Sequence, residues 1–343
     1  MIAAVPEFVA RLSAAASVCV LTFALTLGAR AADNKPFIMK ISVATVDDVV
    51  HQYAKNYAIA LEADSGGRIK TEVYPASQLG SIQRQAEGVQ FGAIQCQVVA
   101  PEFLVGIDER FELLAAPGLV NSMANGQRVA ADPAVRQLML GLGANKGLHG
   151  VGLFMATPSS ISSINPIRHL DDFKGKKIRV FPSQFQREAM QRLGAIPKPM
   201  TLGEVLPGLQ DNALDAAVSS ITVFTTMHFQ IAAKSVTETG QPAIFAMIEI
   251  SKKWYDSLPA DLQQIVEKDA ASESVAINPQ AIAINNKARE AWVDGGGELI
   301  RLPPDEQSAM LGILASVGEE ITKTKPELDA AYKVVTDAAQ RTR

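Results

Sequence analysis

The chain has 343 residues, of which 48% are apolar and 20% are charged, and its formal net charge is −4. This length and apolar content are sufficient for two globular domains, each with a core of its own. The negative charge and the lack of a clustered basic face argue against nucleic acid as a partner, because binding phosphate requires a positive field.

Residues 1–31 have the pattern of a secretory signal peptide. Arg11 is followed by an apolar run from Leu12 to Leu27 and by small residues before Ala32, where we expect cleavage. A membrane-anchoring helix is the alternative for this segment. No later apolar run has the length needed to span a bilayer, so we expect a soluble protein exported to the periplasm. Cleavage would leave Cys96 as the only cysteine, which excludes an intramolecular disulfide.

Strands and helices alternate along the rest of the chain. The pattern predicts strands at 37–45, 68–77, 93–101, 147–156, 176–182, 213–221 and near 298–303. It predicts helices at about 49–64, 82–90, 184–193 and 202–210, a long helix from about 259 to 292 that Pro279 should kink, and helices from about 305 and 328. Strands separated by helices indicate parallel pairing and an α/β fold.

One internal echo bears on the architecture. "EGVQFGAIQCQVV" (87–99) aligns without a gap with "PGLQDNALDAAVS" (207–219), so that Gly88 matches Gly208 and Ile94 matches Leu214. Either any helix-turn-strand junction uses such residues, or the chain holds two similar α/β lobes. In the second case both strands end at one cleft, since ligands of open α/β sheets bind beyond the carboxyl ends of the strands.

The sequence is poor in catalytic and metal-binding motifs. The four histidines lie far apart, no cysteine cluster is present, and neither a Gly-x-Ser-x-Gly elbow nor a phosphate-binding loop occurs. We therefore expect no cofactor and no metal, and a binding protein rather than an enzyme. An exported lyase or isomerase that acts on a small carboxylate is the alternative.

Arg179 is the candidate binding residue. It lies in the apolar strand predicted at 176–182, where an unpaired guanidinium would be costly, so it must meet an anion. That anion is either a structural partner such as Glu204 or Asp215, or a ligand carboxylate, which a guanidinium binds through two parallel hydrogen bonds. Pro182 ends the strand just beyond, and this position near a cleft edge favours the ligand.

Four segments in fixed order carry a family resemblance: "GGRIKTEVYPASQLGS", "LDDFKGKKIRVFPS", "LGAIPKPMTLGEVLPGLQDNALDA" and "SKKWYDSLPADLQQ". They resemble the solute-binding subunits of tripartite ATP-independent periplasmic (TRAP) transporters, the family of the C4-dicarboxylate-binding protein. The resemblance implies a periplasmic-binding-protein-like architecture of two α/β lobes, a cleft between them and a long helix spanning both. We expect one lobe at 37–155 with about 245–278, the other at 156–244 with about 280–303, and C-terminal helices at 304–343.

The same resemblance assigns ligand-binding positions. Arg179 matches the family's arginine that binds the ligand carboxylate. A second arginine of the family falls on Ser159, an asparagine on Ser219, a polar residue on Pro182 and an aromatic residue on Leu202. These replacements keep one anion anchor and remove polar partners, which implies an organic acid with one well-held carboxylate and a less polar remainder.

The remaining expected ligand contacts are Ser220, Phe154 and Val99. Loops near 45–51 and 99–101 should complete the pocket when the lobes close. The resemblance also implies partners, namely a small four-helix and a large multi-helix membrane subunit, and we expect the binding protein to be a monomer. A purely sensory role remains an alternative to transport.

Overall fold

The structure is a computed structural model that describes Met1 and residues 35–343, and the predicted signal peptide falls on residues outside this part. Residues 37–343 contain two sheets, which we call sheet A and sheet B. Sheet A has the strand order β2 (Ile69–Tyr74), β1 (Phe37–Val43), β3 (Cys96–Val99), β10 (Ala243–Ser251) and β4 (Leu148–Pro158). Sheet B has the order β11 (Glu298–Ile300), β9 (Ser235–Thr237), β5 (Ser160–Ser163), β8 (Ala216–Ser219), β6 (Lys177–Val180) and β7 (Ile196–Pro199).

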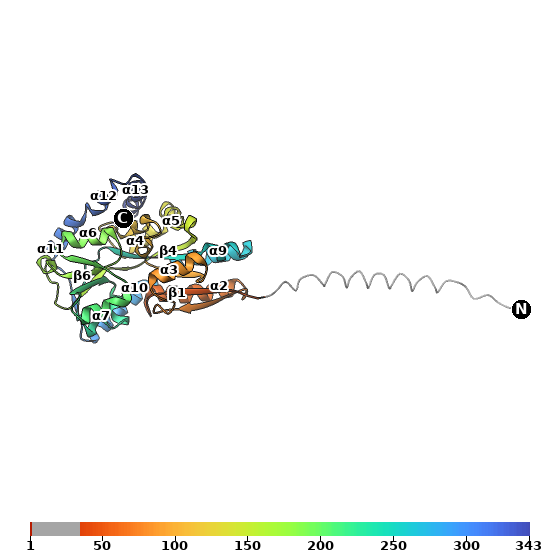
Figure 1. Ribbon diagram of the computed structural model, residues 1–343, viewed down its shortest axis with the longest axis horizontal. Helices are drawn as coiled ribbons and strands as arrows, with labels where there is room; N and C mark the ends of the chain where they lie inside the picture. Colours follow the sequence, from red (N-terminus) through yellow and green to blue (C-terminus); the bar gives the residue numbers. More distant parts are fainter. Residues whose placement is uncertain (2–34) are drawn as a thin grey trace. The chain divides into compact units, whose positions relative to one another are not determined.

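Helices cover both sheets (Figure 1). The α-helices are α2 (Val49–Asp64), α3 (Ile82–Phe91), α4 (Met123–Ala131), α5 (Pro133–Leu140), α6 (Gln184–Arg192), α7 (Val205–Gln210), α8 (Ile221–Thr226), α9 (Lys252–Asp256), α10 (Ala260–Asp294), α11 (Pro304–Leu314), α12 (Val317–Thr322) and α13 (Pro326–Arg341). Short 3-10 helices lie at η1 (Pro101–Leu104), η2 (Glu109–Ala115), η3 (Ala144–Lys146), η4 (Leu170–Phe173), η5 (Leu202–Glu204) and η6 (Phe229–Ile231). Within the described residues, no helix is both long and apolar enough to cross a membrane.

The α/β class is confirmed, but strand pairing is more mixed than predicted. The pairs β1–β2, β1–β3, β6–β7 and β6–β8 are parallel, as helices between strands imply. In sheet A, β10 lies antiparallel between β3 and β4, and in sheet B, β5 lies antiparallel between β8 and β9. Strands β5, β7, β9 and β10 were not predicted from the sequence. The expected parallel pairing is wrong for the pairs that β10 makes with β3 and β4 and that β5 makes with β8 and β9, whereas β9 pairs parallel with β11.

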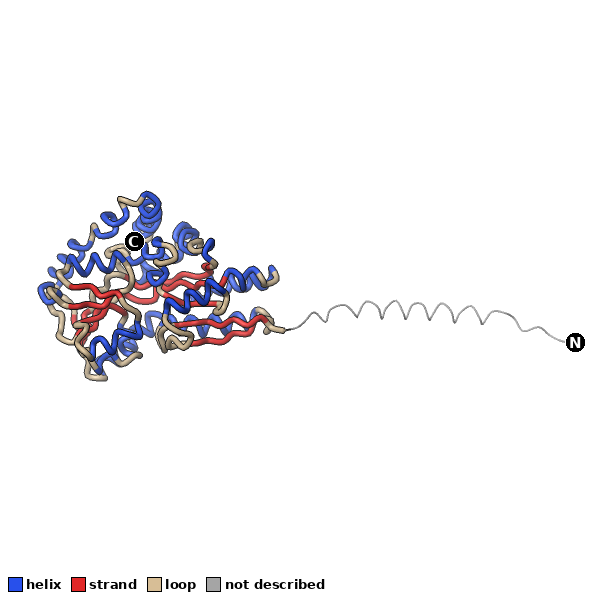
Figure 2. Tube along the Cα trace, in the orientation of Figure 1, coloured by secondary structure: helices blue, strands red, loops and turns tan. Residues whose placement is uncertain are grey.

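The chain passes between the sheets at neighbouring points. Strand β4 of sheet A ends at Pro158, and after Ser159 the chain continues as β5 of sheet B. It returns from β9 to β10 through residues 238–242, and the two connections are hydrogen-bonded, because the Ser159 amide donates to the Pro242 carbonyl over 3.3 Å. Figure 2 shows strands of both sheets meeting in the middle of the molecule.

Helix α10 packs on elements of both sheets, as expected of a bracing helix. It contacts α2 and β4 on the side of sheet A and α8 and β11 on the side of sheet B. Hydroxyl groups fix both halves: Tyr53 Oη donates to the carbonyl of Ala270 over 2.9 Å, and Thr225 Oγ1 donates to that of Ala288 over 3.1 Å. The helix continues through Pro279 to Asp294, close to the end predicted at about residue 292, and Gly295 caps it.

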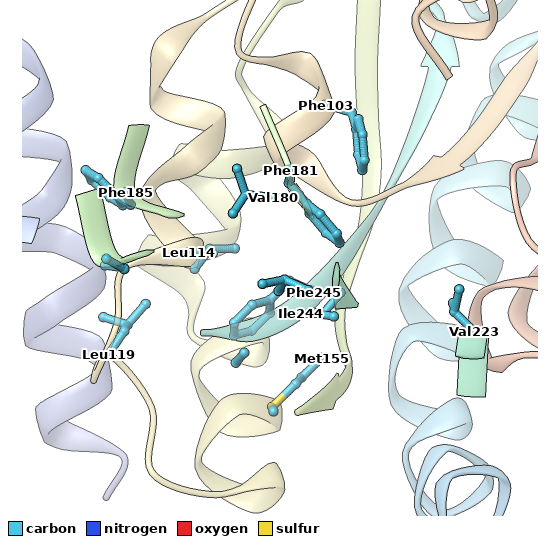
Figure 3. Packing of buried hydrophobic residues seen from close by; sticks show 14 of the residues in the cluster. Phe103, Leu114, Leu119, Met155, Val180, Phe181, Phe185, Val223, Ile244 and Phe245 are labelled. Atoms are coloured by element: carbon cyan, nitrogen blue, oxygen red, sulfur yellow. The ribbon is translucent and has the colours of Figure 1, made fainter. Parts of the chain in front are cut away.

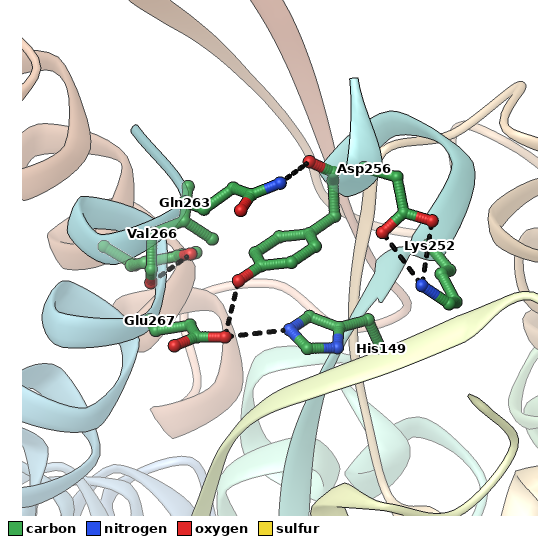
Figure 4. Close-up of polar contacts among 8 residues, drawn as sticks. His149, Lys252, Asp256, Gln263, Val266 and Glu267 are labelled. Carbon is green, nitrogen blue, oxygen red and sulfur yellow. Dashed lines mark hydrogen bonds and ion pairs between the residues drawn. The ribbon is translucent and has the colours of Figure 1, made fainter. Parts of the chain in front are cut away.

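A polar cluster fixes the start of α10 to sheet A (Figure 4). Glu267 of α10 accepts a hydrogen bond from Tyr255 Oη over 2.6 Å, and its carboxylate lies 3.1 Å from Nε2 of His149 on β4. The imidazole also stacks on the Tyr255 ring, with a centroid distance of 4.0 Å. This cluster joins β4, α9 and α10 at the side of sheet A.

The internal echo corresponds to a shared local structure. The Ile94 amide donates to the Gly88 carbonyl over 3.0 Å, and the Leu214 amide donates to the Gly208 carbonyl over 2.9 Å. A Cβ atom at Gly88 would lie 2.8 Å from Cδ1 of Ile94, and one at Gly208 would lie 3.0 Å from Cδ1 of Leu214. Each glycine therefore leaves room for an aliphatic side chain that folds back onto its helix, immediately before β3 in one sheet and β8 in the other.

Candidate functional site: a buried arginine at an apolar cavity

Arg179 lies on β6 in the interior of the molecule, with a side chain only 1% exposed. Its Nε donates to the Met200 carbonyl over 3.1 Å, and its Nη1 donates to the Val218 carbonyl over 2.9 Å. These two carbonyls fix the plane of the guanidinium. Its Nη2 is buried and has no hydrogen-bond partner among residues 35–343.

Two phenylalanine rings lie against the guanidinium. Its carbon is 4.7 Å from the ring centroid of Phe181 and 6.0 Å from that of Phe103, and the two rings pack together with centroids 5.0 Å apart. Figure 3 shows the two rings in the packed interior. Cation–π attraction partly offsets the loss of hydration, yet burial still lowers the pKa of Arg179 below its ordinary value. A guanidinium remains charged at neutral pH even so.

The structural partners considered for Arg179 are engaged elsewhere. Glu204 accepts hydrogen bonds from the amide and hydroxyl of Thr201, and Asp215 accepts one from the Lys177 amide over 2.7 Å. In the described part of the chain, no carboxylate oxygen lies within the 4.0 Å of an ion pair with Arg179. The structural alternative, a salt bridge to Glu204 or Asp215, is therefore wrong.

Arg179 lines a cavity of about 70 Å³ that receives residues from both sheets. At about 30 Å³ per water molecule in the liquid, this volume corresponds to about two water molecules. Most of the wall is apolar: Ala44, Val49, Val50, Ile82, Val98, Val99, Ala100, Phe103, Ala156, Phe181, Leu202, Val223 and Ile244. Its polar side chains are Thr45, Asp48, Gln97, Thr157, Arg179, Ser219, Ser220 and Thr222.

The polar wall residues differ in how far they are already hydrogen-bonded. Asp48 caps α2 and accepts from the His51 amide over 2.9 Å and from Thr45 Oγ1 over 2.8 Å, while burial raises its pKa to about 6. Ser220 caps α8, and its hydroxyl shares a 2.8 Å hydrogen bond with Thr222. The cavity therefore offers one cation, an acid held by its own loop, and a small group of hydroxyls.

The structure brings together five of the eight predicted ligand contacts. Arg179, Val99, Leu202, Ser219 and Ser220 all line the cavity. The loops at 45–51 and 99–101 also contribute to its wall, so the two strand ends singled out by the internal echo meet at one place.

The other three predicted contacts lie elsewhere. Ser159 lines a neighbouring pocket at the connection between the sheets, and its buried hydroxyl has no partner in the described part of the chain. Phe154 stacks on Tyr53 with centroids 4.7 Å apart, so its ring serves packing beneath α10. Pro182 is half-buried and contributes nothing to the cavity wall.

Phe103 and Thr157 belong to the site but were not predicted from the sequence, and the burial of Glu102 beside them was not expected either. Phe103 and Thr157 line the cavity. Glu102, in η1, is 1% exposed, and neither of its carboxyl oxygens has a partner among residues 35–343. An acidic residue within the apolar run "VVAPEFLV" was the one available indication. In the same residues, no group of three or more His, Cys, Asp or Glu side chains is placed to hold a metal ion.

Comparison with known proteins places the chain in a family. Residues 41–325 match the family described as bacterial extracellular solute-binding protein, family 7, so the chain belongs to this family. It is 28% identical over 323 residues to the C4-dicarboxylate-binding periplasmic protein DctP of Rhodobacter capsulatus, which covers 92% of this chain and 95% of that protein. The interpretation as a solute-binding protein of the TRAP type, and not an enzyme, is confirmed.

Solved structures support the two-lobe fold. A TRAP periplasmic solute-binding protein from Desulfovibrio salexigens with bound orotic acid superposes with a TM-score of 0.84 at 20% identity, covering 90% of this chain and 100% of that one. Another from Xanthobacter autotrophicus, with bound β-D-galacturonate, has a TM-score of 0.80 at 25% identity, covering 87% of this chain and 99% of that one. The expected two-lobe architecture is therefore confirmed.

Proposed function

We propose that this protein captures a small organic acid by binding one carboxylate group at Arg179 and enclosing a mainly apolar remainder in the cavity. The observation that carries the proposal is the buried Nη2 of Arg179, a residue of the cavity wall, which has no hydrogen-bond partner among residues 35–343. A buried donor without a partner costs free energy that an incoming acceptor recovers.

The guanidinium has the donors that a carboxylate requires. Of its five N–H groups, one on Nε and one on Nη1 are used by backbone carbonyls. Three remain, on Nη1 and Nη2, which is sufficient for a two-point interaction with a carboxylate. Each charge-assisted hydrogen bond contributes about 1.5–3 kcal/mol, and the pair accounts for a large part of the ~8 kcal/mol of micromolar binding.

The wall favours an apolar ligand body over a sugar acid. Val99, Phe103 and Leu202 offer no hydrogen bonds from their side chains, and a sugar acid would bury several hydroxyl groups against such residues without partners. The hydroxyls of Ser219 and Ser220 suit a single further polar group, such as a keto or hydroxy oxygen.

Closure of the two lobes completes the site. We assign one lobe to 37–155 with about 245–278 and the other to 156–244 with about 280–303, followed by the C-terminal helices at 304–343; the strand content of the two sheets supports this division. A carboxylate bound at Arg179 in the second lobe then contacts the loops of α2 and β3 in the first. This differential contact shifts the population toward the closed form.

Family membership supports the cellular role. In this proposal the signal peptide directs export across the inner membrane, and the monomeric binding protein passes its ligand to a small four-helix and a large multi-helix membrane subunit. Relatives named for periplasmic binding of C4-dicarboxylates and of 2,3-diketo-L-gulonate are consistent with capture of an organic acid.

Ligand-induced thermal stabilisation tests the proposal. We expect 3-methyl-2-oxobutanoate or benzoate to raise the melting temperature more than succinate or galacturonate, and Arg179→Ala to lower the affinity at least 100-fold, because two charge-assisted hydrogen bonds are lost. Arg187→Ala removes an exposed arginine of the same lobe and serves as the matched control. If Arg179→Ala fails to fold, Arg179→Met preserves most of the side-chain volume. Unchanged affinity in either Arg179 variant would reject the proposed anchor.

A further inference from the structure

The cavity wall contains two charged residues, Asp48 and Arg179, and they come from different lobes. Asp48 immediately precedes α2, which packs on strands of sheet A, whereas Arg179 belongs to β6 of sheet B. The two side chains do not form an ion pair, since no charged oxygen of Asp48 lies within 4.0 Å of a charged nitrogen of Arg179. Each charge is therefore available to a group that enters the cavity.

The loop before α2 fixes the carboxylate of Asp48 through one of its two oxygens. Oδ1 accepts a hydrogen bond from Thr45 Oγ1 over 2.8 Å and another from the His51 amide over 2.9 Å. Both bonds end on Oδ1, and no hydrogen bond from residues 35–343 ends on Oδ2. The side chain is only 3% exposed, so Oδ2 has little access to bulk water. Capping of the helix thus uses one oxygen and leaves the other without a donor.

Asp48 acts as an acceptor at neutral pH. Burial raises its pKa to about 6, while the His51 amide and the Thr45 hydroxyl lower it. The carboxyl is therefore mainly ionised at pH 7, and an ionised carboxylate can accept hydrogen bonds but cannot donate them. A ligand group that meets Oδ2 must supply the hydrogen.

Gln97 adds a second acceptor to the wall on the side of sheet A. It lies on β3, is 1% exposed and lines the cavity. Its Nε2 donates to the Ile82 carbonyl over 3.2 Å and to Oε1 of Gln85 over 3.4 Å. Because the Ile82 carbonyl can only accept, it fixes which end of the amide carries the nitrogen. Oε1 of Gln97 is then a buried acceptor without a partner among residues 35–343.

Unused donors and unused acceptors are therefore separated in the cavity wall. Arg179 on sheet B offers the donors of Nη2, whereas Asp48 and Gln97 on the side of sheet A offer acceptors. The hydroxyls of Ser219 and Ser220 can donate or accept, so they do not discriminate between the two kinds of ligand group. A ligand that satisfies both sides carries a carboxylate for Arg179 and a hydrogen-bond donor for Asp48.

We propose that Asp48 is a specificity-determining residue that accepts a hydrogen bond from a hydroxyl or ammonium group of the acid whose carboxylate binds Arg179. The ligand class is then a hydroxy acid or an amino acid with an apolar remainder. This inference rests on the proposed function and deepens it, because it names the second functional group of the ligand.

The physical reason is the cost of placing two acceptors against each other. The oxygen of a keto acid would face the Asp48 carboxylate without a hydrogen between them, and both groups would lose hydration without compensation. A site that hydrogen-bonds a substrate hydroxyl rejects analogues that lack it for the same reason. The charges of Asp48 and Arg179 cancel, so an amino acid, which is itself neutral, adds no net charge to the cavity.

Four acids with one carbon skeleton test the inference: 2-hydroxy-3-methylbutanoate, 3-hydroxy-3-methylbutanoate, valine and 3-methyl-2-oxobutanoate. Their Kd values are measured by calorimetric titration of the wild-type protein at pH 7.5, where Asp48 is ionised. We expect at least one acid with a hydroxyl or ammonium group to bind about 10- to 100-fold more tightly than the oxo acid, as one hydrogen bond to a charged group implies. Comparison of the hydroxy acids with valine then identifies the donor.

Asp48→Asn is the decisive variant. Asparagine caps a helix as well as aspartate does, and Thr45 and His51 should hold its side-chain oxygen as they hold Oδ1. The amide nitrogen then takes the place of Oδ2 and offers a donor, so the oxo acid should bind at least as tightly as the acids with a donor. Asp132→Asn makes the same change at the cap of α5, outside the cavity wall, and should keep the wild-type order.

The outcomes separate this inference from the proposed function. If Asp48→Asn fails to fold, Asp48→Ser keeps a capping hydroxyl, removes the second oxygen and should bring the affinity ratio close to one. A merely capping role of Asp48 would change the melting temperature and leave the ratio as in the wild type. An unchanged ratio, or tighter binding of the oxo acid by the wild type, would overturn the inference; the proposed function stands if Arg179→Met still weakens every ligand. If none of the four acids binds, or if binding does not depend on Arg179, both are wrong.

Discussion

Asn285 links the cavity wall to the middle of α10, and removing its side-chain amide should weaken the protein measurably. Thr157, which lines the cavity, donates from Oγ1 to Oδ1 of Asn285 over 2.6 Å. In turn, Nδ2 of Asn285 donates to the carbonyls of Ala281 and Ala156 over 2.8 and 3.3 Å. Both side chains are buried, so these bonds are shielded from water.

The magnitude follows from the bonds that each variant removes. Asn285→Leu keeps a similar side-chain volume and removes three hydrogen bonds of about 0.5–1.5 kcal/mol each. The Thr157 hydroxyl can still donate to the Pro158 carbonyl, which lies 3.0 Å away. We expect a loss of about 2–3 kcal/mol in the free energy of unfolding. Thr157→Val removes one of the same bonds and should cost about 1 kcal/mol.

Urea unfolding of both single variants and the double variant gives a double-mutant cycle. Because the bond between Thr157 and Asn285 is counted in both single variants, the double variant should be less destabilised than their sum by about 0.5–1.5 kcal/mol. Asn286→Leu, at the exposed neighbouring position, should change the stability by no more than about 0.5 kcal/mol. Strict additivity of the two buried substitutions would refute the reasoning, since the 2.6 Å contact would then carry no coupling energy.

Two further predictions concern packing and pH. Gly88→Ala and Gly208→Ala should each destabilise the protein by about 1–3 kcal/mol, since the new methyl group would lie 2.8 or 3.0 Å from an aliphatic side chain. Gly312→Ala, on α11, has open space around the new methyl group and should stabilise the protein by about 0.5–1 kcal/mol. Thermal unfolding of the three variants tests these expectations. Burial raises the pKa of Glu249, so the folded state retains a proton that the unfolded state loses above about pH 4.5, and stability falls as pH rises. Glu249→Gln should remove this loss, so that its advantage in urea midpoint over the wild type grows from pH 4.5 to pH 8; an advantage that is the same at both pH values would contradict the assignment.

Local sequence patterns were sufficient to predict elements whose ends are marked by capping residues or glycines. The helix predicted at 49–64 matches α2, because Asp48 caps its start and the glycines at 66–67 follow its end. Strand β10 was missed because its sequence, "AIFAMIEIS", is buried at every position and shows no alternation. Its place between β3 and β4 depends on contacts with residues far away in the chain, which no local pattern encodes.

The residues of the candidate site likewise divide into those that the local sequence could predict and those that depend on distant contacts. Arg179 could be found because a permanent charge in an apolar strand demands a partner, and that requirement is visible in the sequence. Phe154 could not be excluded from the ligand contacts, since the choice of face depends on the ring of Tyr53, more than ninety residues earlier in the chain. Glu102 was missed because a Pro-Glu pair after a strand is typical of an exposed turn, and only the packing of η1 shows that it is buried.

The separation between Glu102 and Arg179 has a consequence for closure. A direct ion pair between these two side chains would hold the two sheets together in the absence of ligand, because breaking such a pair leaves two buried charges uncompensated. Their charged atoms instead remain more than 4.0 Å apart, and the guanidinium is oriented by the carbonyls of Met200 and Val218, both from the side of sheet B. On the proposed function, a ligand carboxylate is then the group that supplies close contact with Arg179. On this proposal, a ligand carboxylate favours closure more than the carboxyl of Glu102 does.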